Sequence, residues 1–319
     1  MSIVAQAQPD RASLRSPLAV SQSRRSTTSF ARRASGYLFL VPYGIVFAMF
    51  IVLPFVVSLV LAFCQYDLAA QRPPKFVGLR NFREALVGDP FFWKAVFVTF
   101  RYVAWIIPAQ LVLSMLLALG MNAMTRGRNT VRAMLFLPGM FSIAVTAILW
   151  QWFYNQEFGL FNYLLKKVGI PGVPWLSSSN LAMVSIVLMS LWWTVGGSAA
   201  IVLTGLQQIP RQVLEAASID GANPWQSFWQ VTLPMLKPVL LFMVVMNTIG
   251  AFQMFAQSML LTNGGPEMTT RGVVSLIYDT AFGDYRLGYG AAISWLLFLL
   301  IVGFSLIQFL LIRRGAAGE

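Results

Sequence analysis

Charge is scarce in this sequence. Only 11% of the 319 residues are charged, which is less than half of the roughly 25% usual in soluble domains. Hydrophobic residues make up 57%, with a mean hydropathy of +0.68. A water-soluble fold of this length could not cover its surface with so few charges. The composition therefore indicates a membrane protein.

Histidine is absent, and cysteine occurs once, at Cys64. The absence of histidine excludes a His-based metal site, catalytic triad or proton relay. A single cysteine excludes a disulfide framework. The sequence accordingly predicts no metal site and no catalytic residue, and the protein is not expected to be an enzyme.

Acidic side chains are missing from every long apolar stretch, because all eleven lie between the stretches or near the chain ends. Proton-coupled carriers normally place an acidic or histidine relay within the bilayer, and voltage sensors place arginines there. The chain also lacks a G-x-x-x-x-G-K-[ST] phosphate loop, so it cannot bind ATP in that way. Uphill transport would need energy from another subunit.

Six uncharged apolar stretches are long enough to cross a bilayer, which requires roughly 20 residues. The alternating ten-residue segments typical of an outer-membrane barrel do not occur. We therefore predict an all-α, polytopic membrane protein built as a six-helix transmembrane bundle. The predicted spans are Tyr37–Phe63, Tyr102–Met124, Ala133–Tyr154, Leu181–Leu203, Val239–Leu261 and Leu287–Ile312.

The basic excess, 23 Lys and Arg against 11 Asp and Glu, is explained by topology. With the N-terminus inside, the cytoplasmic segments carry a net +9 and the external ones +3, as the positive-inside rule requires. Both termini are then cytoplasmic. The arginine-rich residues 1–36 are predicted to form a disordered tail that sets topology, since the first span is too long for a signal peptide and nucleic acid is not needed to explain the charge.

The cytoplasmic connection 204–238 has the pattern of a structured loop. Pro210 suits the first helical position, and Arg211–Ile219 are good helix formers. Gly221 permits the left-handed turn that ends such a helix. Asn223-Pro224 would start a second helix over Trp225–Thr232 that leads into the fifth span. The small side chains of the first helix would let it lie in a groove on a soluble partner, or it could rest on the membrane surface.

The same loop resembles the EAA loop of binding-protein-dependent ABC importers, through Glu215-Ala216-Ala217, Asp220-Gly221-Ala222, and Leu233-Pro234 with Pro238. The resemblance covers about residues 37–312 and is closest to the permeases of maltose and glycerol-3-phosphate importers. One departure is Asn263, where glycine is usual. Further similar segments are Phe76–Phe82, Phe136-Leu137-Pro138, Phe158–Asn162, Leu261–Pro266 and Leu287–Ala292.

The resemblance implies a type I ABC importer permease in the cell's inner (cytoplasmic) membrane. Its partners would be a second homologous permease, two ATP-binding subunits and an extracytoplasmic solute-binding protein, with ATP and Mg²⁺ bound by the ATPases and no cofactor bound by this chain. The helix Arg211–Ile219 would be the coupling helix that sits in a cleft on the ATPase. Glu215 would make polar contacts there, Ala216 and Ala217 would permit close approach, and Gly221 would permit the turn; Asp220, Ala222, Leu233 and Pro234 complete the predicted coupling residues.

A solute pathway is predicted in the fifth span, where the uncharged amides of Asn247, Gln253 and Gln257 can hydrogen-bond hydroxyls. Gln253 and Gln257 are four residues apart, so they are expected to share one helical face. Trp192 and Trp193 can stack on sugar rings. The alternative for the amides is interhelical hydrogen bonding. Trp150 and Trp152 are expected to be interface anchors instead.

The predicted organisation is a tail over 1–36, a six-span permease domain over 37–312 and a cytoplasmic tail over 313–319. The predicted function is to form half of an ATP-driven pathway for a carbohydrate or related polyol. A self-sufficient secondary carrier or channel is the first alternative, and an intramembrane enzyme using Cys64 is the second. The sequence does not identify the solute.

Overall fold

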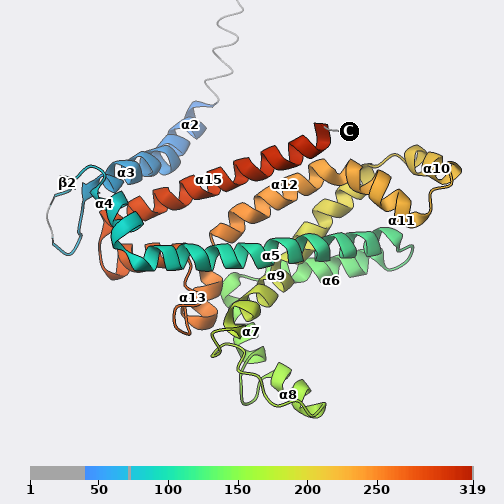
Figure 1. The fold of residues 1–319 in the computed structure, drawn as a ribbon, viewed down its shortest axis with the longest axis horizontal. Coiled ribbons are helices and arrows are strands. Elements are labelled where there is room, and N and C mark those ends of the chain that lie inside the picture. Colours follow the sequence, from blue (N-terminus) through green and yellow to red (C-terminus); the bar gives the residue numbers. More distant parts are fainter. Residues whose placement is uncertain (1–39, 71–72, 318–319) are drawn as a thin grey trace, which may run out of the picture. The chain divides into compact units, whose positions relative to one another are not determined.

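The computed structural model describes residues 40–70 and 73–317, with side chains as far as residue 311. The predicted tail over 1–36 lies outside these residues. The described residues divide into two units, one ending at Phe55 and the other beginning at Val56. Nearly all of the described chain is helical (Figure 1), which confirms the all-α class.

The first span is a helical run over Val41–Ala62. It consists of α2 (Val41–Phe47), a π-helical turn η1 (Ala48–Val52) and α3 (Leu53–Ala62). No residue of α2 or η1 is buried. The mean hydropathy of this first span, 2.9, is the highest among the candidate spans. Lipid or another protein chain must therefore cover the span in the membrane.

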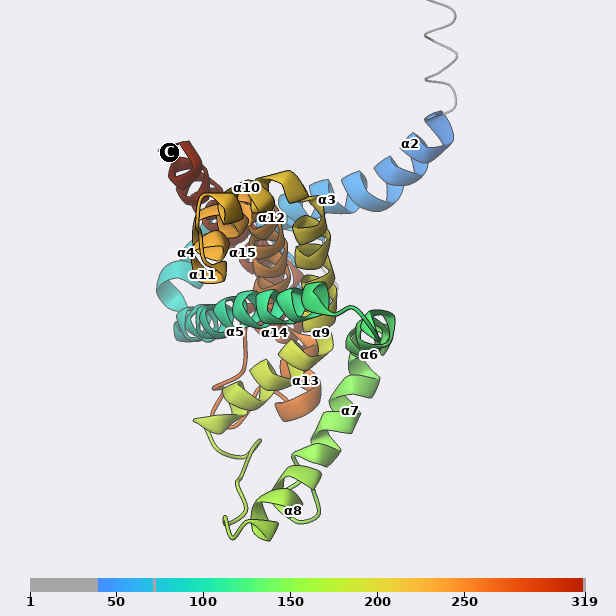
Figure 2. The ribbon, with the colours of Figure 1, turned by 90° about the vertical axis from the view of Figure 1, so that its right-hand side faces the viewer.

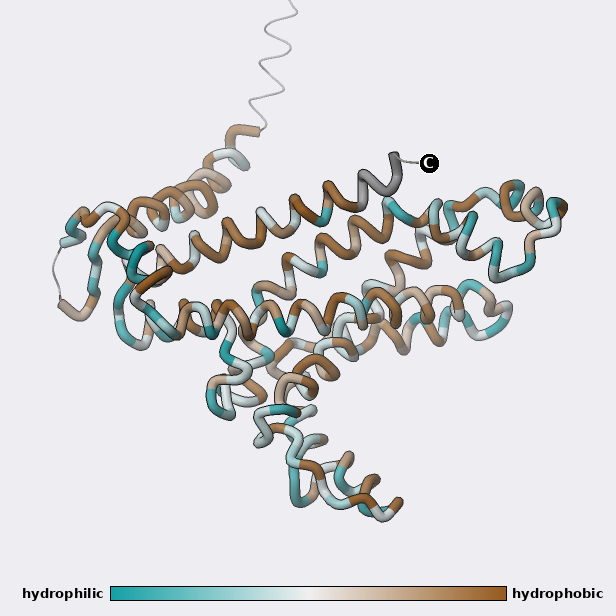
Figure 3. Tube along the Cα trace, viewed as in Figure 1, coloured by the Kyte–Doolittle hydropathy of each residue, from teal (hydrophilic) through white to brown (hydrophobic). Residues whose placement is uncertain are grey.

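Four long helices dominate the second unit: α5 (Pro90–Ala123), α9 (Leu181–Gln208), α12 (Leu233–Phe252) and α15 (Leu287–Ala317). α9 packs against α5, which it crosses (Figure 2). α12 contacts α5, α9 and α15. These helices are apolar over most of their length, and polar residues gather at their ends and in the connections (Figure 3). The described residues contain five helices able to cross a membrane by length and composition, or six if one bent pair is a single span.

The second span begins twelve residues earlier than predicted, at Pro90. The Asp89 carboxylate accepts a hydrogen bond from the Phe91 amide at 2.8 Å, and Pro90 occupies the first turn. This cap and proline are strong helix-start signals. The search for uncharged stretches missed them because the first turns carry Lys94 and Arg101.

The third span was predicted to be continuous over Ala133–Tyr154, and this is wrong. It consists of α6 (Arg128–Met140) and α7 (Ile143–Phe153), which meet at a 99° bend. Pro138 removes one backbone donor near the break. Ser142 then caps α7 by accepting a hydrogen bond from the Val145 amide at 3.3 Å.

The fifth span was also misplaced. The predicted Val239–Leu261 begins too late and continues too far, since α12 starts at Leu233 and ends at Phe252, and a separate helix α13 covers Ala256–Thr262. The last helix extends to Ala317, so the predicted tail over 313–319 is mostly helical backbone.

The remaining elements join the long helices. They are α4 (Arg80–Arg83), the π-helical turn η2 (Glu84–Gly88), α8 (Leu160–Lys167), α10 (Arg211–Ile219), α11 (Pro224–Ser227), η3 (Phe228–Thr232), α14 (Val273–Tyr278), η4 (Asp279–Gly283), and the antiparallel pair β1 (Cys64–Gln65) and β2 (Lys75–Phe76).

Candidate coupling loop and solute pathway

The predicted coupling helix is present with the predicted bounds, as α10 over Arg211–Ile219. Pro210 is its N-cap rather than its first helical residue. None of its residues is buried, and Ile219 is 86% exposed. α10 and α11 lie together at one end of α9 and α12 (Figure 1).

The end of α10 is a Schellman motif. The Ala222 amide donates to the Ala217 carbonyl at 3.0 Å, and the Gly221 amide donates to the Ser218 carbonyl at 3.1 Å. Gly221 has φ +82°, a conformation that glycine adopts without a steric penalty. The loop therefore needs glycine at this position, as the sequence indicated.

A capping box starts the second helix of the loop. The Asn223 side chain accepts from the Gln226 amide, and the Gln226 side chain accepts from the Asn223 amide, both at 2.9 Å. α11, η3 and α12 then run on as one helical stretch, Pro224–Phe252. The part-buried Phe228 packs against the core cluster around Leu206 and Leu236. This contact anchors the second helix of the loop to the helical core.

The eight predicted coupling residues occupy two places in this loop. Glu215 is exposed, and no hydrogen bond or ion pair connects it to another described residue. Leu233 and Pro234 form the first turn of α12. The other five, Ala216, Ala217, Asp220, Gly221 and Ala222, form the end of α10 and its turn.

A polar cluster joins three of the long helices. The Asn247 amide on α12 donates to the Ser198 hydroxyl on α9 at 3.1 Å. The Gln110 amide on α5 donates to Ser198 at 2.8 Å and to Thr194 at 3.1 Å. Gln110 is 4% exposed and was missed from the sequence. Its signal is an amide placed two residues after Pro108 within an apolar stretch.

The other two predicted pathway amides do not share a helix with Asn247. Gln253 is the C-cap of α12, and Gln257 belongs to α13. The prediction that Gln253 and Gln257 share one helical face is therefore wrong, because the helix ends between them. Gln253 is exposed and Gln257 is half-buried.

The two tryptophans predicted to stack on sugar rings, Trp192 and Trp193, have different surroundings. Trp193 donates its indole N–H to the Phe141 carbonyl at 3.0 Å, so it satisfies a backbone group at the bend between α6 and α7. Trp192 is half-buried and lies edge-on to Trp150, with ring centroids 5.8 Å apart. Trp150 is only 7% exposed, which contradicts its prediction as an interface anchor, whereas Trp152 is 50% exposed. Trp150 is buried because α8 and α9 close over α7.

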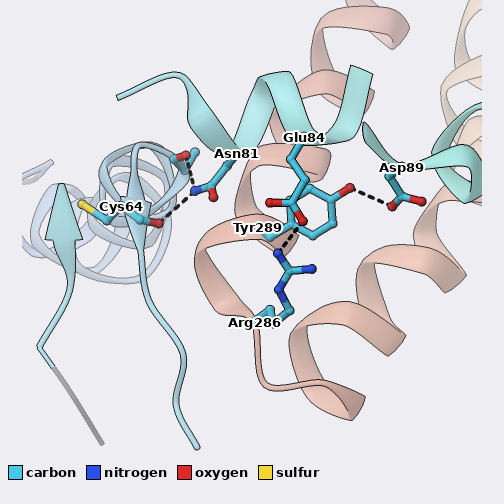
Figure 4. A network of polar contacts seen from close by, with 7 residues as sticks. Cys64, Asn81, Glu84, Asp89, Arg286 and Tyr289 are labelled. Atoms are coloured by element: carbon cyan, nitrogen blue, oxygen red, sulfur yellow. Dashed lines mark hydrogen bonds and ion pairs between the residues drawn. The ribbon is translucent and has the colours of Figure 1, made fainter. Parts of the chain in front are cut away.

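A second polar network connects the segment before α5 to the start of α15 (Figure 4). Asn81 donates to the Ala62 and Cys64 carbonyls, both at 2.9 Å. The Arg286 guanidinium lies 2.6 Å from the Glu84 carboxylate. The Tyr289 hydroxyl donates to Asp89 at 2.7 Å. This network holds α4 and η2 against α15.

Within the described residues, no group of three His, Cys, Asp or Glu side chains could hold a metal ion.

Comparisons with known proteins assign the chain to a family. Residues 110–315 match the family described as the binding-protein-dependent transport system inner membrane component. The chain is 36% identical to the probable ABC transporter permease YesP of Bacillus subtilis (strain 168), over 86% of this chain and 89% of the relative. It is 34% identical to the trehalose/maltose transport permease MalF of Thermococcus litoralis, over 85% of this chain and 91% of the relative.

The fold has a close counterpart among solved structures. A chain of a bacterial ABC transporter involved in the import of the acidic polysaccharide alginate superposes with a TM-score of 0.79 at 22% identity, over 90% of this chain and 98% of that chain. At that identity the likeness concerns the fold. Family and fold agree: the chain belongs to the inner membrane components of binding-protein-dependent transport systems, as a multi-pass permease subunit of an ABC importer.

Proposed function

We propose that this permease forms half of the translocation pathway for a carbohydrate or related polyol that an extracytoplasmic binding protein delivers. The support comes from its relatives, whose names include transport of trehalose and maltose, arabinooligosaccharides, and sn-glycerol-3-phosphate. All of these solutes carry several hydroxyl groups. The single structural observation that carries the proposal is the cluster of uncharged amides and hydroxyls around Asn247, between α5, α9 and α12.

The exposed helix α10 is the proposed contact with an ATPase subunit. The exposed Glu215 would bind polar groups of the cleft, and the small Ala216 and Ala217 would let the helix approach closely. ATP and Mg²⁺ would be held by the two ATPase subunits. Because α11, η3 and α12 are continuous, closure of the ATPases would tilt α12 and change which side of the membrane has access to the cluster.

The polar cluster is the proposed solute contact. The side chains of this cluster are hydrogen-bonded to one another: Asn247, Gln110, Thr194 and Ser198. They can exchange a hydrogen bond within the cluster for one to a solute hydroxyl, so the hydroxyl would not face a purely apolar surface. The half-buried Trp192, two residues before Thr194, offers an aromatic face to a sugar ring. Gln253 and Gln257 would contact the solute at a separate point of the pathway, since they lie beyond the end of α12.

The complete importer would contain a second, homologous permease, two ATP-binding subunits and the solute-binding protein, in the inner membrane with both termini of this chain cytoplasmic. The external net charge of +3 against +9 inside supports that orientation. The lipid bilayer is its only other partner in this proposal.

Reconstitution tests the proposal. Vesicles containing the chain with its permease partner, ATPases and binding protein should take up a radiolabelled carbohydrate when ATP is enclosed with the ATPases. The matched control carries a Walker-site substitution in the ATPase and should be inactive. Uptake by this chain alone under a proton gradient would support a secondary carrier and overturn the proposal.

A further inference from the structure

The polar cluster between α5, α9 and α12 has a fixed direction of hydrogen bonding. The Thr194 hydroxyl donates its one proton to the Ser190 carbonyl at 2.7 Å, so toward Gln110 it can only accept. The Gln110 amide nitrogen therefore faces Thr194 and Ser198, to which it donates at 3.1 Å and 2.8 Å. The Asn247 amide nitrogen also donates to Ser198. Both amides thus direct their donors into the protein.

The two amide oxygens remain as acceptors. Neither Gln110 Oε1 nor Asn247 Oδ1 accepts a hydrogen bond from another described residue. Neither oxygen is sealed within the protein, since both keep a surface that a group the size of water can reach. Gln110 as a whole is 4% exposed. Because a buried acceptor without a donor is costly, this site favours a bound molecule that brings donors.

Open surface adjoins the cluster on two helices. Gly250 lies about one turn after Asn247 on α12, and nothing lies within 4 Å of a β-carbon added there. Gly197 has the same relation to Thr194 on α9, and its added β-carbon would also meet nothing within 4 Å. Both glycines are exposed. A molecule larger than water can therefore lie beside the amides.

Charged side chains are distant from the cluster along its three helices, all of which the structure describes. α9 carries none along its length. On α5 the nearest is Arg101, nine residues before Gln110, and its guanidinium is bound to a backbone carbonyl of the loop before α14. On α12 the nearest is Lys237, ten residues before Asn247. These spacings correspond to roughly 14–15 Å along a helix. An anion at the cluster would lose its water without gaining a cationic partner, which is expensive.

We infer that the cluster binds an uncharged polyhydroxylated solute and excludes solutes that carry a phosphate, sulfonate or carboxylate group. Two solute hydroxyls donate to Gln110 Oε1 and Asn247 Oδ1, and the body of the solute lies over the open surface at Gly250. An anionic group in the same place faces two amide oxygens that repel it. The inference rests on the proposed function, because it names the charge class of the solute that the pathway carries.

The relatives by themselves do not decide this charge class. Their names include transport of the uncharged sugars trehalose and maltose and of the anionic sn-glycerol-3-phosphate. The inference for this chain therefore depends on its own donors, acceptors and charges.

Direct binding of solute to the importer tests the charge class. The complex of this chain with its permease partner and ATPases is used without the binding protein, so that delivery does not select the solute. Equilibrium dialysis compares radiolabelled trehalose with trehalose 6-phosphate, which differ by one phosphate group. Trehalose should bind about tenfold or more tightly than its phosphate. Equal affinities, or tighter binding of the phosphate, would overturn the inference.

An added cation tests whether the cluster sets the preference. Asn247→Lys places an ammonium group beside the open surface and should reduce the preference for trehalose about tenfold or reverse it, because a phosphate then gains a charge-assisted hydrogen bond. Gln253→Lys adds the same charge beyond the end of α12 and is the matched control. It should leave the preference unchanged. Equal effects of the two substitutions would show that the cluster does not select the solute.

The open surface needs its own variant. Gly250→Phe fills the space beside Asn247 without removing a hydrogen bond and should weaken trehalose binding about tenfold, with an unchanged thermal midpoint showing that the complex is folded. Gly120→Phe on α5 is the matched control, since its added β-carbon also meets nothing within 4 Å. Binding of neither disaccharide by a wild-type complex that still imports a carbohydrate would overturn the inference and leave the proposed function standing. Failure of ATP-driven uptake would overturn the proposed function and the inference with it.

Discussion

A β-carbon added at Gly196 of α9 would lie 1.8 Å from the backbone carbonyl oxygen of Leu135 on α6. At Gly139 on α6, the same addition would lie 3.4 Å from the Trp193 carbonyl oxygen. The two helices therefore meet backbone to backbone over about one turn. Small residues permit such close approach between membrane helices. The hydrophobic effect does not drive helices together in lipid, so they associate through close van der Waals packing.

Gly196→Ala should destabilise the permease, because the added carbon forces the two backbones apart. Overpacking of this kind costs typically 1–3 kcal/mol, and the thermal midpoint of the detergent-purified chain should fall measurably. Gly197→Ala is the matched control, since nothing lies within 4 Å of its added carbon. Equal midpoints for the two variants would contradict the close contact.

Gly221→Asp should uncouple the importer. A side chain at φ +82° is strained by roughly 1–2 kcal/mol, and the turn that presents α10 would change. The expected result in reconstituted complexes is normal membrane insertion with lost solute-stimulated ATPase activity and uptake.

Charge reversal tests the same helix without backbone strain. Glu215→Lys should reduce coupling strongly, and Glu215→Gln should reduce it less, because glutamine keeps a polar side chain of the same length. Full activity in Gly221→Asp and Glu215→Lys together would show that α10 is not the coupling helix.

Asn247→Leu should raise the KM for uptake while the folded complex retains its basal ATPase activity. The substitution removes the donor to Ser198 and leaves Gln110 to hold that hydroxyl. Gln253→Leu, an exposed amide beyond the end of α12, should change the KM little. If Asn247→Leu lowers only the thermal midpoint and not transport, its role is interhelical bonding.

The network between the segment before α5 and the start of α15 allows a comparison of two polar contacts. The Glu84–Arg286 pair is 35% and 43% exposed, and pairs of this kind contribute about 0–1 kcal/mol. The Tyr289 hydroxyl donates to a carboxylate from a buried ring, and such bonds contribute about 1.5–3 kcal/mol. Tyr289→Phe should therefore lower the thermal midpoint more than Arg286→Gln. The reverse order would show that the ion pair holds the network.

The coupling loop could be predicted closely because its signals are local. A proline before α10, the glycine after it and the Asn223-Pro224 start all act on their own backbone, so residue types at fixed spacing were enough. The same holds for α9 and α15, whose predicted starts, Leu181 and Leu287, are the observed ones.

The breaks in the third and fifth spans could not be located in this way. Hydropathy stays high through Phe141 and through Gln253, since a bend changes the direction of the helix and not its composition. Trp193 satisfies the carbonyl left free at the first break, and that contact comes from a helix more than fifty residues away. The burial of Trp150 depends likewise on packing by α8 and α9.

Because Pro224–Phe252 is one continuous helical stretch, a small rotation at its first residue produces a large displacement farther along α12. From Pro224 to Asn247 the helical rise amounts to roughly 35 Å. A rotation of about 5° at the Pro224 end therefore displaces the Asn247 amide by about 3 Å, enough to break its hydrogen bond to Ser198 at 3.1 Å. The tilt angle of α12 would then be linked both to the affinity for solute and to the position of the ATPase.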